Sequence, residues 1–191
     1  MPQKYSLFAA CRDEYDRVVF NLLLQTGLRM SEAMYLDWKH VDFDSKILKV
    51  REERKSGKKI KDRAERSVPI PNDLIELLKT WKDKHPTMKL AIGTENDTPN
   101  KKLLRTLKRV TTAAKLHCGQ CDGCKSKSKE CSLWYLHKFR ATYTTTLLRN
   151  GVDIGTVMEY TGHSDMTTTM RYLRPAESEM MQSKISSISW V

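Results

Sequence analysis

The chain has 191 residues, of which 39% are hydrophobic and 30% charged, a balance typical of a soluble globular protein with one good-sized domain. No apolar run approaches the roughly 20 residues of a membrane-spanning helix, and the polar residues after Met1 argue against a secretion signal. The formal net charge of +11 favours a polyanionic partner such as a nucleic acid.

The first part of the chain predicts two consecutive helices. Apolar residues recur at helical spacing over residues 12–26, and Gly27 should end that helix. We expect Ser31 to cap the second helix and Glu32 to lie in its first turn, near the positive end of the helix dipole.

The middle of the chain predicts a small sheet followed by two helices. Residues 47–51 alternate as a strand should, and 67–71 form a short edge strand closed by prolines. The very polar segment 54–66 between them predicts a turn. Amphipathic helices are expected at 72–84 and 100–116.

A cysteine-rich insert follows the second of these helices. Four cysteines with two short CxxC steps fit a tetrahedral structural zinc site. The alternatives are a reduced loop without metal, or a disulfide, which a cytosolic protein disfavours. Lysines at alternate positions of the same loop suggest contact with a DNA backbone. The expected metal ligands are Cys118, Cys121, Cys124 and Cys131, and the lysines are Lys125, Lys127 and Lys129.

Residues 136–149 are predicted to form a helix that ends before Gly151. The threonine-rich stretch 142–146 favours a strand instead. We retain the helix because it places His137 and Arg140, three residues apart, on one face.

The last third predicts two short helices. Asp153 should cap the first, which ends near Gly162. Ser164 or Asp165 should cap the second, which is expected to carry Tyr172. The expected fold is therefore mostly α with one small antiparallel sheet.

Five side chains in this arrangement supply what cleavage of a phosphodiester requires without a metal. Arginine neutralises the non-bridging oxygens with a planar fork that keeps its charge, and Arg29 and Arg140 are the candidates. His137 and His163 can move a proton or donate a hydrogen bond, and Tyr172 can attack the phosphorus. Taken singly, each is more often a surface or packing residue, so it is the combination that indicates this chemistry.

The order and spacing of these residues resemble the catalytic domain of the tyrosine recombinase, or phage integrase, family. The similarity spans residues 12–174. Residues 26–32 (TGLRMSE) match the first arginine box, and 137–140 (HKFR) match the HxxR box. Residues 161–172 match the Gly-His box with a tyrosine nine residues beyond the histidine, and 61–69 resemble the lysine turn.

The resemblance implies a role for each matched residue. Tyr172 would attack the scissile phosphorus and become a 3′-phosphotyrosine, while Arg29 and Arg140 clamp the non-bridging oxygens. His137 would assist proton removal or bind the phosphate, and His163 would donate a hydrogen bond to the transition state. The covalent bond conserves the energy for rejoining, so neither ATP nor another catalytic cofactor is expected.

The general acid has more candidate residues than any other catalytic role. The resemblance assigns protonation of the departing 5′ oxygen to Lys61, because its distance from Pro69 fits the family pattern. Lys55, Lys58 and Lys59 lie in the same loop and remain alternatives. Glu32 is expected to support the first arginine.

The resemblance also implies the setting of the activity. We expect residues 1–175 to form the recombinase catalytic domain, with the insert at 116–132 and a weak tail helix in 176–191. The N-terminal DNA-clamping domain of such proteins is expected to be missing, as in a truncated form of a longer recombinase. The expected partner is double-stranded DNA, bound by a homotetramer with no membrane association. The expected location is the cytoplasm, in association with the nucleoid, for a prokaryotic or phage-encoded protein. The alternatives are a type IB topoisomerase and a zinc-containing DNA-binding module without catalysis.

Overall fold

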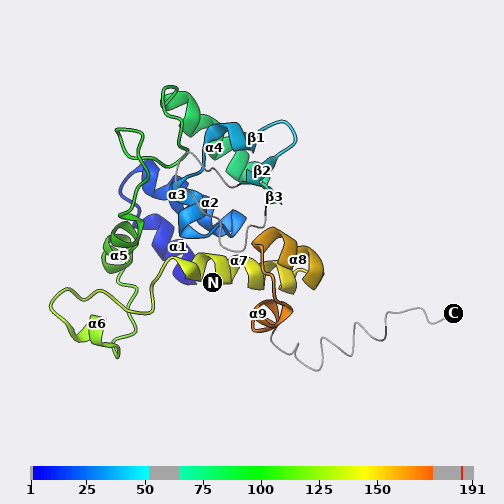
Figure 1. The fold of residues 1–191 in the computed structure, drawn as a ribbon. Helices are drawn as coiled ribbons and strands as arrows, with labels where there is room; N and C mark the ends of the chain where they lie inside the picture. The colour runs from blue at the N-terminus through cyan, green and yellow to red at the C-terminus, as the bar shows by residue number, and fades with distance from the viewer. Residues whose placement is uncertain (1, 52–64, 174–185, 187–191) are drawn as a thin grey trace.

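The computed structural model describes residues 2–51, 65–173 and 186. The expected mostly helical fold with a small antiparallel sheet is confirmed (Figure 1). Lys61 and, apart from Ser186, the expected tail helix in 176–191 lie outside the described residues. The elements in chain order are α1 (Pro2–Ala9), α2 (Glu14–Thr26), α3 (Met30–Met34), a 3-10 helix η1 (Trp38–His40), β1 (Val41–Asp42), β2 (Ile47–Val50), β3 (Arg66–Pro69), α4 (Asn72–Lys84), α5 (Leu103–Ala113), α6 (Asp122–Lys125), α7 (His137–Arg149), α8 (Ile154–Thr161) and α9 (Met166–Met170).

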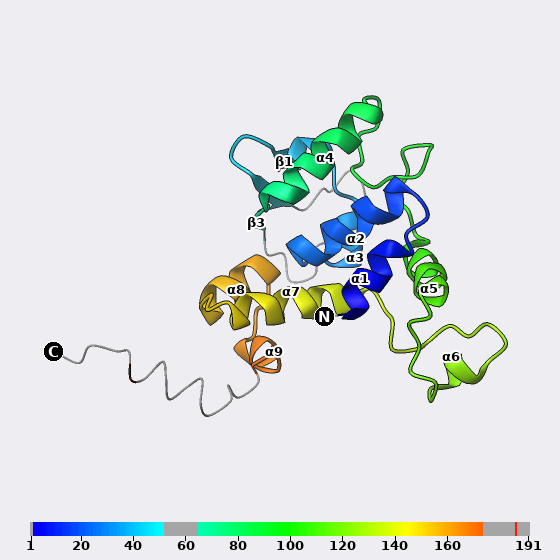
Figure 2. The same cartoon turned by 180° about the vertical axis from the view of Figure 1, so that it is seen from behind.

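Helix α2 is the centre of the hydrophobic core. It lies between α4 and α7 in both views (Figures 1 and 2), and its apolar residues are therefore buried on more than one face. Phe20 of α2 stacks on Phe139 of α7, with ring centroids 5.4 Å apart and an interplanar angle of 10°. This packing holds the start of α7, where His137 and Arg140 lie.

The sheet brings one edge strand to the end of α8. Its order is β1-β2-β3, with antiparallel neighbours, and Leu48 pairs with Val68 in the register between β2 and β3. Both of these side chains are fully buried. The prediction of an edge strand closed by prolines is confirmed, and the strand begins at Arg66, whose side chain points to α8.

Two local expectations are wrong. Helix α3 begins at Met30 with Arg29 as its N-cap, so Ser31 lies inside the helix. The carboxylate of Glu32 accepts the backbone N–H of Arg29 at 2.7 Å and leaves no capping role for Ser31. Helix α9 starts after its Asp165 cap as expected but ends at Met170, so Tyr172 lies in the turn that follows.

Helix α7 forms despite its threonines. The hydroxyls of Thr142 and Thr144 donate to the carbonyls four residues earlier, each at 2.9 Å, which satisfies them within the helix. The helix ends as predicted before Gly151, which has a φ of 83°.

Within the described residues, no helix combines the length and the apolar character that a bilayer crossing requires.

Candidate active site

Three arginines from different elements donate to three consecutive backbone carbonyls at the C-terminal end of α8. The last carbonyls of a helix have no partner within it, and they carry the negative end of its dipole. Charged guanidinium groups supply both the hydrogen-bond donors and the positive charge that this helix end requires. The arginine side chains and the turn after α8 therefore hold one another in place. The pairs are Arg66 Nε with Tyr160 O (2.8 Å), Arg140 Nη2 with Thr161 O, and Arg29 Nη2 with Gly162 O (3.0 Å).

A buried carboxylate joins two of these arginines. Glu32 is 3% exposed and accepts both Nη groups of Arg66, at 2.9 and 2.7 Å. It also forms a longer 3.4 Å ion pair with Arg29. Burial raises the pKa of Glu32, but the hydrogen bonds and charge of Arg66, with the contacts from Arg29, outweigh it and lower the pKa. Glu32 therefore stays ionised.

Arg140 lies deepest in the site. It is 1% exposed, and its Nη1 donates to Gly27 O at 2.8 Å. Burial, then the charge of Arg29, lower the pKa of Arg140 to about 10, so it still carries its charge at neutral pH. Among the described residues its Nε–H has no partner. A buried cation with spare donors beside a second arginine is suited to a phosphate.

The two histidines lie next to these arginines. His137 is the first residue of α7 and is exposed. Partial desolvation and the charges of Arg140 and Arg29 lower the pKa of His137. The same causes lower the pKa of His163 to about 4, so this imidazole is neutral at pH 7. Its Nδ1 lies 2.8 Å from Thr169 Oγ1, which leaves Nε2 for a substrate.

Tyr172 lies against His163. The two rings are nearly parallel, at 12°, with centroids 6.4 Å apart. The Tyr172 backbone N–H donates to Thr169 O at 3.0 Å, in the turn that ends α9. The phenol is partly exposed. Tyr172 also interacts electrostatically with Arg140, so it lies near the arginine group while remaining accessible.

The structure thus brings together Arg29, His137, Arg140, His163 and Tyr172, whereas Lys61 is outside the described residues. Arg66 and Thr169 are site residues to which sequence reasoning assigned no role. Arg66 lies within the segment compared with the lysine turn, but its partner Tyr160 is 94 residues away. No local pattern could have indicated that contact.

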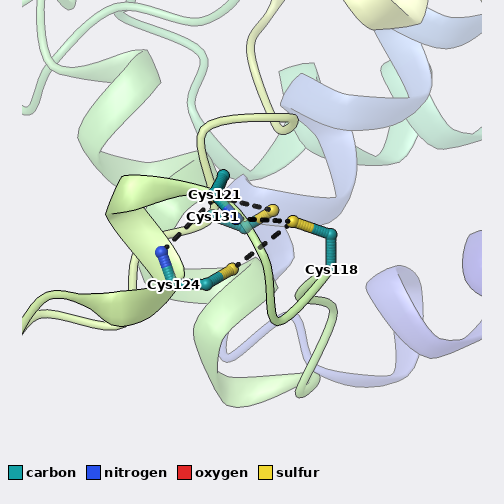
Figure 3. A group of neighbouring side chains, drawn as sticks. All are labelled: Cys118, Cys121, Cys124 and Cys131. Carbon is teal, nitrogen blue, oxygen red and sulfur yellow. Dashed lines mark hydrogen bonds between the residues drawn. The ribbon is translucent and has the colours of Figure 1, made fainter.

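The four predicted cysteine ligands form one cluster (Figure 3). Their sulfurs all lie within 4.8 Å of one another, with Cys118 and Cys124 at 3.8 Å and Cys121 and Cys131 at 3.9 Å. A Zn–S bond of about 2.3 Å gives a tetrahedral edge of about 3.8 Å. The set therefore fits a tetrahedral metal ion.

Backbone donors prepare the sulfur of Cys121 for negative charge, whereas burial raises the pKa of Cys124 to about 11. Cys121 Sγ accepts the N–H groups of Ser132 at 3.2 Å and Cys124 at 3.4 Å. These bonds, that of Ser132 first, lower the pKa of Cys121 to about 5. A thiolate is the form that binds metal.

Comparison with known proteins supports a single family. The model of the phage integrase family matches residues 3–179. The tyrosine recombinase XerA of Thermococcus onnurineus is 30% identical over 173 residues, covering 83% of this chain and 50% of the relative. The chain thus spans about half the length of such curated relatives.

Solved structures show the same fold at low identity. The crystal structure of XerA recombinase superposes with a TM-score of 0.72 at 21% identity, covering 100% of this chain and 65% of that one. The Tn1549 transposon integrase in complex with a circular intermediate DNA gives 0.70 at 19% identity, covering 97% and 63%. Since the family model matches nearly the whole chain, this chain belongs to the phage integrase family.

Proposed function

We propose that this chain is the catalytic part of a site-specific DNA recombinase that cleaves and rejoins strands through Tyr172. The observation that carries the proposal is the group formed by Arg29, Arg140 and His163 at the end of α8, with the Tyr172 ring against it. Breaking a phosphodiester requires positive charge where negative charge develops, and Arg29 and Arg140 supply it.

In the cleavage step, Tyr172 Oη forms a bond to phosphorus and the bond to the 5′ oxygen breaks. The phenolic proton leaves, with His137 assisting, and a proton is delivered to the departing oxygen. Arg29 and Arg140 neutralise the non-bridging oxygens, and neutral His163 donates a hydrogen bond from Nε2. The phosphotyrosine retains the ester, so attack by a 5′ hydroxyl rejoins DNA without ATP.

Lys61 is the proposed donor of the proton to the 5′ oxygen. Its support is its place in the sequence, five residues before Arg66, which is anchored beside Glu32. Five residues span at most about 18 Å, so the lysine can reach the site.

The proposed partner is double-stranded DNA, bound by a homotetramer. The net charge of +11 supports a polyanionic partner, and the similar Tn1549 integrase is known in complex with DNA. Within this assembly, residues 1–175 would form the catalytic domain, with the insert at 116–132 and a tail at 176–191.

We further propose that the cysteine cluster binds a structural Zn²⁺ ion. The two sulfur separations near 3.8 Å support a closed tetrahedral site, in which four protein ligands leave no open position for substrate. The ion would fix the fold of the insert and take no part in strand cleavage.

Selection from a randomised DNA library tests the function without knowledge of the target site. The chain is incubated with nicked duplexes of random sequence, and covalent adducts are captured under denaturing conditions and sequenced. We expect one enriched site with wild-type protein and with Tyr160→Phe, a matched control on α8. Tyr172→Phe should give no adduct, and an adduct that persists in this variant would reject the proposed nucleophile.

A further inference from the structure

We infer that Arg66 is a positioning residue for strand cleavage, fixing the geometry of Arg29 and of the turn that carries His163. The inference rests on the proposed function. The arginine belongs to β3, far in sequence from both residues, and its side chain is 2% exposed.

The contacts of Arg66 differ from those of Arg140, because none of its three guanidinium nitrogens lacks a protein acceptor, whereas Arg140 Nε has none among the described residues. Its Nη1 and Nη2 each donate to a different oxygen of Glu32, and its Nε donates to Tyr160 O. All three nitrogens of the guanidinium are engaged, and the group is buried. Arg66 therefore acts through the residues it holds.

One path from Arg66 leads to Arg29. Glu32 Oε2 accepts both Arg66 Nη2 and the backbone N–H of Arg29, each at 2.7 Å, so one carboxylate oxygen ties the two arginines together. The other oxygen pairs with the Arg29 side chain at 3.4 Å. Orientation of this carboxylate by the Arg66 fork consequently sets the start of α3 and the direction of the Arg29 guanidinium.

The second path leads to His163. Arg66 packs on Gly162, where an added Cβ would lie 3.1 Å from Nη1 and 3.3 Å from Cδ. Gly162 ends α8 in a left-handed conformation, with φ of 60°, and His163 follows it. Arg66 thus fixes the place where the chain leaves α8 for the histidine and, beyond it, Tyr172.

A lysine cannot replace this set of contacts. It keeps one positive charge beside Glu32, but as a single point charge it cannot bind both carboxylate oxygens and Tyr160 O with a planar fork. Arg66→Lys should therefore retain a folded protein while loosening Arg29 and the His163 turn. This outcome separates positioning from simple charge compensation.

The chain offers a matched control. Arg109 Nη2 of α5 contacts both oxygens of buried Asp16 of α2, each at 2.8 Å, and α5 lies apart from α8 in both views (Figures 1 and 2). Arg109→Lys therefore changes a second Arg–carboxylate pair away from the site, in which the arginine side chain is 33% exposed. Thermal unfolding of both variants checks that they are folded.

The test measures single-turnover cleavage at saturating concentrations of a nicked duplex recovered by the selection. A matched duplex carries a methylphosphonate at the scissile position, which removes one oxygen charge and with it part of the need for Arg29. We expect Arg66→Lys to slow cleavage of the phosphate about 10-fold or more, with a smaller loss on the methylphosphonate and unchanged DNA affinity. Arg109→Lys should match wild type on both.

Three outcomes would overturn the inference. Wild-type rates in Arg66→Lys would show that charge alone suffices. Equal losses on the two substrates would show a general structural defect. Absence of an adduct with wild-type protein would reject the proposed function, and the inference with it, whereas a wild-type adduct with an unaffected Arg66→Lys rejects the inference alone.

Discussion

Gly27 links the backbone between α2 and α3 to Arg140, the proposed phosphate ligand. Replacement of Gly27 by alanine should lower stability for two separate reasons. The residue has a φ of 62°, in the left-handed region that costs a side chain about 1–2 kcal/mol. An added Cβ would also lie 2.9 Å from Tyr143 Cγ and 3.0 Å from Cε1. Such overpacking costs about 1–3 kcal/mol more.

Gly151→Ala is the matched control, because it has only the first of these costs. Its φ is 83°, and nothing lies within 4 Å of an added Cβ. Urea unfolding should show that the free energy of unfolding falls by about 1–2 kcal/mol in Gly151→Ala and by about 2–5 kcal/mol in Gly27→Ala.

Activity should separate the variants further. Gly27 O accepts Nη1 of Arg140 at 2.8 Å, so a displaced backbone also misplaces this arginine. We expect Gly27→Ala to cleave the selected DNA much more slowly while Gly151→Ala retains its rate. Equal stabilities in the two variants, or a full cleavage rate in Gly27→Ala, would refute the reasoning.

Three further predictions concern other parts of the molecule. The pKa of His163 is lowered to about 4 from an ordinary value of 6.5, so its contribution to stability is complete above pH 6.5 and is lost as the pH falls toward 4. Between pH 7.5 and pH 5, the free energy of unfolding should therefore fall more for wild type than for His163→Gln. Equal decreases would contradict the lowered pKa. Elemental analysis should find one zinc per chain in wild type and almost none in Cys121→Ser, with a lower melting temperature in the variant; a metal-free wild type would reject the site. Substitution of Lys125, Lys127 and Lys129 by Gln should reduce the salt dependence of binding to random duplex DNA by about three counterions, and an unchanged slope would show that the loop does not contact DNA.

Local patterns predicted most of the helices and the separate pieces of the site. Gly27, Gly151 and Gly162 each follow a helix in the left-handed conformation that favours glycine, so these boundaries could be predicted from single residues. The cysteine cluster was predictable for a similar reason, because CxxC spacing places consecutive sulfurs on one turn. The roles of the matched catalytic residues stay predictions.

Long-range contacts account for what the sequence could not predict. Ser31 is a good capping residue, but the Glu32 carboxylate that caps Arg29 is held by Arg66, 34 residues away. The threonines of α7 favour a strand in isolation, yet packing on α2 and hydroxyl bonds to the preceding turn stabilise the helix. No local pattern marks Arg66, because its role depends on contact with Tyr160 O at the end of α8.

Tyr172 is proposed to form the covalent bond to DNA, and peptide mapping of the covalent adduct tests this assignment most directly. Trypsin, which does not cut before proline, should release residues 172–184, a peptide in which Tyr172 is the only tyrosine. After nuclease trimming, mass spectrometry should find a nucleotide attached through its 3′ phosphate to this peptide. A nucleotide on any other peptide, or captured DNA with an unmodified 172–184 peptide, would contradict the assignment.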